Sequence, residues 1–237
     1  MTIRTVRIIG PGRAGRSLAR ALDAAASWRV VDVLGRGDEV AGAAAGVDLV
    51  VIATPDHAIE AVAGAIHQEP QTVIAHLAGS RGLEALAPHA RRAALHPLMT
   101  LADEHTGAAR LRGAWFAVAG DPLILDVVSA LDGSAFTVTD EHRALYHAAA
   151  CVAANHLVAL LAQVERLAAA AGVPFSPFFD LARAAVDNVE HLGARAALTG
   201  PAARGDRETI DRHLAAMDAA ERPAYEAMVA QARRLVA

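Results

Sequence analysis

The chain has 237 residues, a net charge of -4 and 54% hydrophobic residues, which is enough for one large domain or two smaller ones. The acidic balance provides no polybasic surface for nucleic acid. The single cysteine, Cys151, excludes an internal disulfide and is typical of a reducing compartment. A strand predicted almost at Met1 leaves no room for a signal peptide, so we expect a cytoplasmic protein. The sequence contains no lysine, which excludes any mechanism that needs a catalytic lysine.

The first motif is a glycine-rich turn, Gly10–Gly15, between a strand predicted over Thr5–Ile9 and a helix predicted over Ser17–Ala26. This arrangement is typical of dinucleotide binding. The first glycine permits the tight turn, the second lets the backbone approach the pyrophosphate, and the third lets helix and strand pack closely. The helix N-terminus then offers free N–H groups to the anion. We therefore expect the cofactor to contact Gly10, Gly12, Arg13, Ala14 and Gly15.

The first half of the chain alternates strands and helices, with continuous apolar strands that indicate a parallel sheet covered on both faces. Further strands are predicted over Val30–Leu34, Asp48–Ala53, Thr72–His76, Ala93–His96, Trp115–Ala119 and Ala135–Val138. Helices are predicted over Asp38–Ala45, His57–His67 and Pro122–Leu131. The fold class is therefore α/β, with a doubly wound, mainly parallel sheet of the Rossmann type.

After Thr139 the strand pattern disappears, so residues 1–138 are predicted to form a dinucleotide-binding domain and residues 139–237 an all-helical domain for substrate binding and dimerisation. The predicted helices are Asp140–Ala171, Phe178–Leu192, Arg207–Ala220 and Pro223–Val236.

The residues from Ala144 to Val164 include no Asp, Glu, Lys or Arg, which is a run of membrane-spanning length. Its histidines, Asn155 and many alanines instead favour a deeply buried helix, and we expect no membrane association. Because such a helix needs cover on every side, we expect a homodimer.

The end of the second strand indicates which dinucleotide binds. NAD-binding domains place an acidic residue there for the ribose 2′-hydroxyl. Here Asp32 lies inside the strand, whereas Arg36 follows it and suits a 2′-phosphate, with Arg13 in a position to help. The alternative is that Arg36 is a solvated loop residue. We favour NADP(H).

Ligands of doubly wound sheets bind beyond the carboxyl ends of the strands. Thr54 and Pro55 follow the third strand and are predicted to border the nicotinamide. His76 ends the fourth strand and Ser80 follows it, which makes both candidates for substrate binding, and His96 ends the fifth as a candidate catalytic residue. A lone histidine at such a position is more often structural, but two on neighbouring strands favour function.

Two further segments carry candidates. On the long helix, His147, Cys151 and Asn155 recur every four residues and form one stripe, which predicts His147 as general acid and Asn155 as a substrate-orienting amide. The alternative is a satisfied core histidine. In the loop 198–206, Thr199 and Arg204 are predicted to bind substrate, with Arg204 holding a carboxylate. No histidine or cysteine spacing supports zinc, so no metal is predicted.

Together these segments resemble the Rossmann-like proteins that carry a DUF2520 helical domain, within the 6-phosphogluconate-dehydrogenase-like group of reductases. The matching pieces are Gly10–Gly15, Thr54–Asp56, His76–Ser80, His96–Leu98, Tyr146–Ala149 with Asn155, and Leu198–Asp206. The resemblance covers nearly the whole chain. It implies a two-domain, NADP-type oxidoreductase, usually dimeric, with substrate held between the domains.

Some relatives in this group are ketopantoate reductases, so the resemblance implies an NADPH-dependent reductase of a small 2-oxo acid such as 2-dehydropantoate. The better-known members use a lysine with the helix asparagine, whereas this chain has Cys151 one turn before Asn155 and no lysine. A histidine must then replace the lysine. The segment His96-Pro97-Leu98 is similar to the His-Pro-Met of prephenate and arogenate dehydrogenases. Several alternatives stay open. The substrate could be prephenate, arogenate or an imine, or the protein could be a deazaflavin-dependent NADP reductase or a non-catalytic NADP(H)-binding sensor or scaffold.

Overall fold

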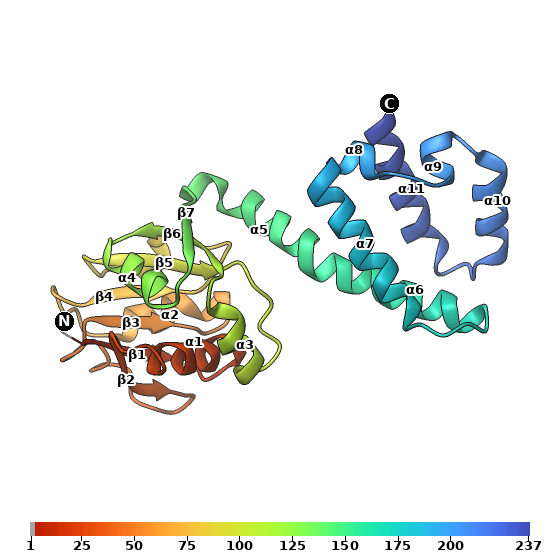
Figure 1. Ribbon diagram of the computed structural model, residues 1–237. Coiled ribbons are helices and arrows are strands. Elements are labelled where there is room, and N and C mark those ends of the chain that lie inside the picture. Colours follow the sequence, from red (N-terminus) through yellow and green to blue (C-terminus); the bar gives the residue numbers. More distant parts are fainter. Residues whose placement is uncertain (1–2) are drawn as a thin grey trace. The chain divides into compact units, whose positions relative to one another are not determined.

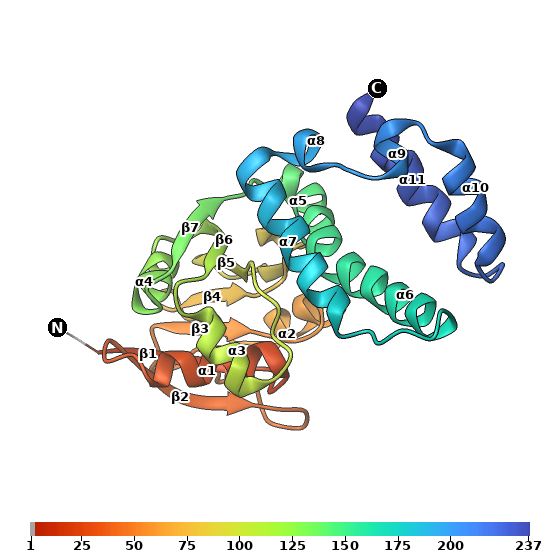
Figure 2. The ribbon, with the colours of Figure 1, turned by 45° about the vertical axis from the view of Figure 1, so that its right-hand side comes forward.

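The computed structural model describes residues 3–237. They form two compact units, the first ending at Ala154 and the second comprising Asn155–Ala237. The first unit is built on a seven-stranded sheet with the strand order β2-β1-β3-β4-β5-β6-β7 (Figures 1 and 2). Every neighbouring pair is parallel except β5 and β6. The strands are β1 (Arg4–Ile9), β2 (Trp28–Leu34), β3 (Leu49–Ile52), β4 (Val73–His76), β5 (Arg92–Pro97), β6 (Trp115–Gly120) and β7 (Ser134–Thr137).

Both faces of the sheet are covered, as the apolar strands predict. In β3, Leu49 and Val51 belong to one core cluster and Val50 and Ile52 to the other, because successive side chains point to opposite faces. The first cluster includes side chains of α1 (Arg13–Asp23), α3 (Glu104–Leu111) and α4 (Leu123–Ala130), and the second includes side chains of α2 (Ile59–Ala65). This confirms the predicted doubly wound α/β fold.

The local predictions fail in two places. The segment Asp38–Ala45, predicted as a helix, is a series of turns, and the flanking Gly37 and Gly46 both have positive φ. The guanidinium of Arg7 donates a hydrogen bond of 2.5 Å to the carbonyl oxygen of Ala43. Glycines and a carbonyl engaged by a side chain both disfavour a helix. The sequence reading also missed α3, although Asp103 caps it by accepting from the backbone of His105 and Thr106.

The second unit is helical. It comprises α6 (Leu157–Ala170), α7 (Pro177–Leu192), α8 (Ala194–Ala197), α9 (Pro201–Arg204), α10 (Arg207–Ala216) and α11 (Arg222–Val236). Gln163 of α6 donates to the carbonyl of Glu221 at 2.8 Å, and Tyr225 of α11 lies 2.6 Å from Nδ1 of His213 on α10. The predicted loop 198–206 contains the single-turn helix α9 in its middle.

The apolar run 144–164 is not deeply buried, so that expectation is wrong. Leu145, Val152 and Val158 are 73%, 56% and 67% exposed in this chain. Within the first unit, α5 (Arg143–Cys151) packs through Tyr146 and His147, which approach His96 and Gly79, and this leaves Leu145 on the opposite side uncovered. By length and composition, the helix over Asp140–Ala170 would also suffice to cross a membrane, with a mean hydropathy of 1.5, although a single such helix is weak evidence.

Candidate active site

The glycine turn has the geometry that dinucleotide binding requires. Gly10 has a φ of +111°, and a Cβ there would lie 2.7 Å from the carbonyl carbon of Ala53. A Cβ on Gly15 would lie 2.0 Å from the carbonyl oxygen of Gly10, so only glycine allows α1 to pack this closely on β1. At Gly12, by contrast, a Cβ would meet nothing within 4 Å. The turn is therefore tight at its ends and open in its middle, where the phosphates would approach.

The N-terminus of α1 is ready for an anion. Gly12 is its N-cap and supplies no side-chain cap, and no acidic residue lies in the first turn. Arg13 is exposed at the first helical position and Ala14 is half-buried behind it. Next to this turn, the hydroxyl oxygen of Thr54 is buried without a hydrogen-bond partner, while Pro55 is exposed. Free helix amides, an open glycine and an orphaned hydroxyl fit a bound dinucleotide.

The end of β2 lies beside the glycine turn, because the N–H of Gly10 donates to the carbonyl of Leu34 at 2.8 Å. Asp32 is engaged by Arg7, whose Nε lies 3.1 Å from its carboxylate. Arg36 is exposed in the turn after β2. Asp32 is thus already paired, and in the segment that follows β2 the carboxylate of Asp38 accepts from the N–H of Gly35 at 2.7 Å beside the exposed Arg36.

A chain of contacts leads along the carboxyl edge of the sheet from Thr54 to the histidines. The Ser80 hydroxyl donates to the carboxylate of Asp56 at 2.8 Å, which joins the segments after β3 and β4. A Cβ on Gly79 would lie 2.6 Å from Cδ2 of His147 and 2.9 Å from Nε2 of His96. Gly79 therefore lets these two rings approach the backbone, and their centroids are 5.7 Å apart at 82°.

His76 and His96 have different surroundings. His76 is completely buried, with Nε2 at 3.2 Å from the carbonyl oxygen of Gly82 and Nδ1 without a partner, and burial lowers its pKa. His96 is half-buried, with Nδ1 at 2.6 Å from the hydroxyl of Tyr146. Burial, followed by the neighbouring His147 and Arg143, lowers the pKa of His96 to about 4. Both rings are therefore neutral near pH 7.

The sequence reading missed Arg143. This arginine, the first residue of α5, is completely buried, and its Nε lies 3.2 Å from the carboxylate of Asp140. Its two terminal nitrogens, Nη1 and Nη2, are buried without hydrogen-bond partners. A buried guanidinium with unpaired donors is rare and costly. The available signal was its position as the last charge before the uncharged run, one turn ahead of His147.

The remaining predicted residues lie in other surroundings. Cys151 Sγ is 4.0 Å from either ring nitrogen of His147. Asn155 is exposed within a π-helical turn, Val152–His156, which sequence reasoning did not anticipate; such turns are frequent at functional sites. Thr199 and Arg204 belong to the second unit, where both are exposed, and Asp206 caps α10. The predicted site residues are thus divided between the two units.

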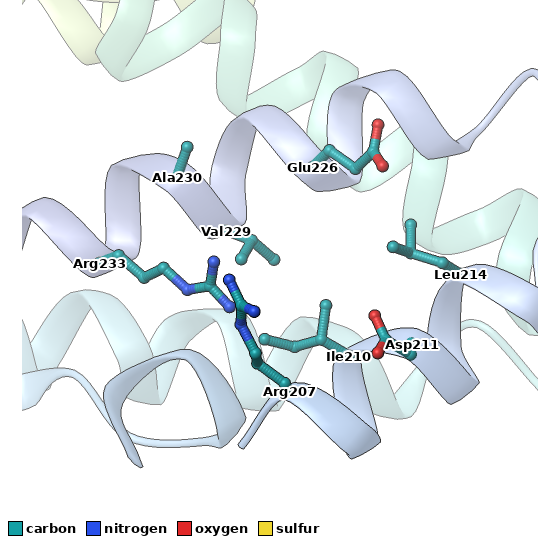
Figure 3. Close-up of a pocket in the computed structure, with 8 residues that line it drawn as sticks. All are labelled: Arg207, Ile210, Asp211, Leu214, Glu226, Val229, Ala230 and Arg233. Carbon is teal, nitrogen blue, oxygen red and sulfur yellow. The ribbon is translucent and has the colours of Figure 1, made fainter. Parts of the chain in front are cut away.

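The helical unit has a cavity of its own between α10 and α11, of about 320 Å³ (Figure 3). At one end the guanidinium groups of Arg207 and Arg233 point toward each other, and Asp211 and Glu226 lie toward the other end. None of the residues predicted from the sequence lines it. Its volume is at the lower end for small-molecule pockets, and the free helix amides and open glycine that fit a dinucleotide lie at the glycine turn instead.

Comparison with solved structures shows that the chain shares its fold with several proteins whose structures are described as reductases or NADP oxidoreductases. A candidate NADP oxidoreductase from Bacteroides fragilis has 18% identity and a TM-score of 0.80, covering 99% of this chain and 98% of its own. A 1-pyrroline-5-carboxylate reductase from Streptococcus pyogenes has 14% identity and a TM-score of 0.67, covering 98% and 99%. A reductive aminase from Aspergillus terreus, in complex with NADPH and ethyl levulinate, has 17% identity and a TM-score of 0.68, covering 98% and 94%.

The family described as a domain of unknown function (DUF2520) matches residues 116–232 of the chain. The match begins in β6 and includes all of α5, so it covers Arg143 and His147 as well as the helical unit. The sequence matches no curated protein.

Proposed function

We propose that the protein uses NADPH to reduce the carbonyl group of a small 2-oxo acid, with 2-dehydropantoate as the first compound to test. The observation that supports this most directly is the pairing of two features on one sheet edge: a glycine turn that fits a dinucleotide, and a neutral His96 beside the buried Arg143. Bound NADPH would supply the hydride. The residues of this edge would bind the cofactor and stabilise the oxygen that becomes negative.

The residues that we propose for the cofactor are Gly10, Gly12, Arg13, Ala14 and Gly15 at the pyrophosphate, Arg36 at the 2′-phosphate, and Thr54 and Pro55 at the nicotinamide. The free amides of α1 favour the negative phosphates. The unpartnered hydroxyl of Thr54 fits a polar group of the ring's substituent.

For the chemistry we propose His147 and His96, whose rings meet at Gly79, with Asn155 orienting the carbonyl. A donated proton or hydrogen bond at the carbonyl oxygen is worth about 10²- to 10⁴-fold in rate. His76, Ser80, Thr199 and Arg204 are proposed for substrate binding, with Arg204 holding the carboxylate. A dimer formed through the helical domain, residues 139–237, completes the proposal.

Electrostatics favours a carbonyl over an iminium substrate. Carbonyl reduction creates a negative oxygen, which the buried guanidinium of Arg143 stabilises. A positively charged iminium would be repelled by the same cation. Reduction of a C=N bond is the second candidate, because solved structures with this fold include a 1-pyrroline-5-carboxylate reductase and a reductive aminase.

The test is NADPH consumption against a panel of 2-oxo acids that includes 2-dehydropantoate, together with cyclic imines. Prephenate and arogenate are assayed with NADP⁺ in the oxidative direction. Turnover of a 2-oxo acid supports the proposal, and exclusive turnover of imines or of prephenate overturns it. Binding of NADPH without turnover of any compound would identify a sensor or scaffold. With a substrate in hand, Arg204→Ala should chiefly raise KM, whereas His147→Ala should lower kcat.

A further inference from the structure

The hydroxyl of Tyr146 contacts the ring of His96 closely, although the two residues come from different elements. Tyr146 lies on α5 and His96 near the end of β5, and the hydroxyl oxygen is 2.6 Å from Nδ1. Their ring centroids are 5.5 Å apart at 85°, and Phe136 packs edge-on against Tyr146 at 5.7 Å. The pair is thus held by a short hydrogen bond and by the packing of Phe136 against the phenol ring.

One assignment of donor and acceptor satisfies both groups within the protein. Within residues 3–237, the hydroxyl of Tyr146 has a hydrogen-bond partner only in Nδ1 of His96. If Nδ1–H donated to the phenol oxygen, the hydroxyl proton would have no protein acceptor. If the hydroxyl donates to Nδ1, both groups are satisfied, and the proton of the neutral His96 ring must then be on Nε2.

The Nε2 atom of His96 remains available to a ligand. No hydrogen bond to it is present within residues 3–237, and it is not among their buried polar atoms that lack a partner. It lies over the backbone of Gly79, beside the ring of His147. His96 therefore has one nitrogen bound to a hydroxyl donor and the other presented as an open N–H.

We propose that Tyr146 is the proton source for the proposed reduction and that His96 relays its proton to the substrate. The proposal rests on the proposed function. Hydride addition at the carbonyl carbon moves the π electron pair onto oxygen. The alkoxide then takes the Nε2 proton of His96 as the Tyr146 hydroxyl proton moves to Nδ1. The ring stays neutral and the phenol becomes a phenolate. The starting state returns when Nε2 takes up a proton from solvent and the Nδ1 proton moves back to the phenolate. Each turnover therefore consumes one solvent proton.

The surroundings of the pair explain why a relay is needed. Because burial, followed by the neighbouring His147 and Arg143, lowers the pKa of His96 to about 4, the imidazolium form of His96 is not available near pH 7. A neutral imidazole gives up its Nε2 proton easily only when Nδ1 receives another. Burial raises the pKa of Tyr146, which keeps the phenol protonated, and the nearby Arg143 stabilises a transient phenolate. The groups that face His96 are Asp56, His76, Arg143, Tyr146 and His147.

The decisive variant is Tyr146→Phe, assayed in the full-length protein with the substrate found in the panel. We expect kcat to fall by about 10²- to 10⁴-fold, while the Kd for NADPH is unchanged within about twofold. The helical unit offers a matched control, Tyr225→Phe, because Tyr225 and His213 make the same contact at 2.6 Å, with ring centroids 5.8 Å apart at 81°. This control should retain the wild-type kcat.

The pH profile separates proton transfer from a structural effect. In the wild type kcat should be constant between about pH 5 and 8, because a neutral ring and a protonated phenol persist throughout. In Tyr146→Phe the neutral His96 ring has lost its proton source, so donation from this ring requires its imidazolium form, and kcat should fall as the pH rises across that range. A Tyr146→Phe variant with a flat profile and more than about half of the wild-type kcat would overturn the relay.

Nitrogen NMR of histidine-labelled protein, without substrate, tests the starting state. The His96 ring, assigned with His96→Gln, should carry its proton on Nε2 in the wild type and lose this preference in Tyr146→Phe. A proton on Nδ1 in the wild type overturns the relay and leaves the proposed function intact. If no panel compound is reduced, the proposed function fails, and the relay fails with it as a step of that reaction.

Discussion

Replacing Arg143 with methionine should make the protein more stable and less active. The arginine side chain is 1% exposed, its Nε contacts a half-exposed Asp140 at 3.2 Å, and its other two nitrogens have no partner. Each buried donor without a partner costs about 1–3 kcal/mol, and an ion pair with an exposed carboxylate returns only about 0–1 kcal/mol. Methionine fills a similar apolar volume without a charge. We therefore expect Arg143→Met to raise the free energy of unfolding by about 1–3 kcal/mol.

Urea unfolding followed by tryptophan fluorescence measures this change, because both tryptophans, Trp28 and Trp115, belong to the first unit. Arg91→Met is the matched control. Every guanidinium nitrogen of Arg91 has a hydrogen-bond partner. Its Nε and Nη2 lie 2.8 and 3.0 Å from the carboxylate of Asp121, and its Nη1 lies 2.5 Å from the carbonyl oxygen of Gln71. Its replacement should destabilise the unit by about 1 kcal/mol or more.

The same variant tests the proposed electrostatic role of Arg143. Without the buried cation, kcat for a 2-oxo acid should fall by at least about tenfold. A loss of stability greater than about 1 kcal/mol at an unchanged m-value would refute the reasoning, because it would mean that the guanidinium is satisfied in the native state. Unchanged kcat would remove Arg143 from the proposed reaction.

Three further predictions follow from other parts of the molecule. Because the pKa of His96 is lowered to about 4, the unfolded chain binds a proton before the folded chain does as the pH falls below about 6.5. The free energy of unfolding should therefore decrease by up to about 3 kcal/mol between about pH 6.5 and 4. In urea titrations His96→Gln should remove most of this loss, and equal losses in variant and wild type would contradict the prediction. NADPH should bind at least about tenfold more tightly than NADH in titration calorimetry and Arg36→Ala should lose the preference, whereas equal affinities in the wild type would contradict it. Sedimentation of the wild type should give a dimer. The dimer should dissociate in a Leu181→Glu, Val189→Glu double variant, since these side chains of α7 are 66% and 48% exposed. A wild-type monomer of 24.6 kDa at micromolar concentration would contradict the dimer.

The sequence was sufficient where local constraints dominate. The glycine turn could be predicted because Gly10 lies against Ala53, just after β3, and Gly15 lies against Gly10, just after β1. Any strand–turn–helix unit of this kind creates such close contacts. The strands could be placed because their apolar runs must be covered on both faces. The false helix over 38–45 shows the limit, since alanines favour a helix and only the tertiary contact of Arg7 with that segment reveals the turns.

The histidine site required the structure. Sequence spacing placed His147 on a polar stripe and His96 at a strand end, but not the contact of both rings at Gly79. The pairing of Tyr146 with His96 joins residues 50 positions apart. The burial of Arg143 depends on how α5 meets the sheet, and a charged residue at a helix start is usually exposed. Such features arise from tertiary packing and leave no periodic pattern in the sequence.

The distribution of unsatisfied groups locates the site independently of any motif. Within residues 3–237, the buried side-chain polar atoms that lack a partner are confined to Thr54, His76, Arg81 and Arg143. The first three lie at or just beyond the carboxyl ends of β3 and β4, and Arg143 joins this edge through Asp140, whose carboxylate accepts from the backbone of Leu83. Folded proteins satisfy nearly all buried polar groups, and exceptions concentrate where a ligand is bound or chemistry occurs. The sheet therefore carries its unfavourable polar groups along the edge where doubly wound folds bind ligands, next to the glycine turn and the two histidine rings.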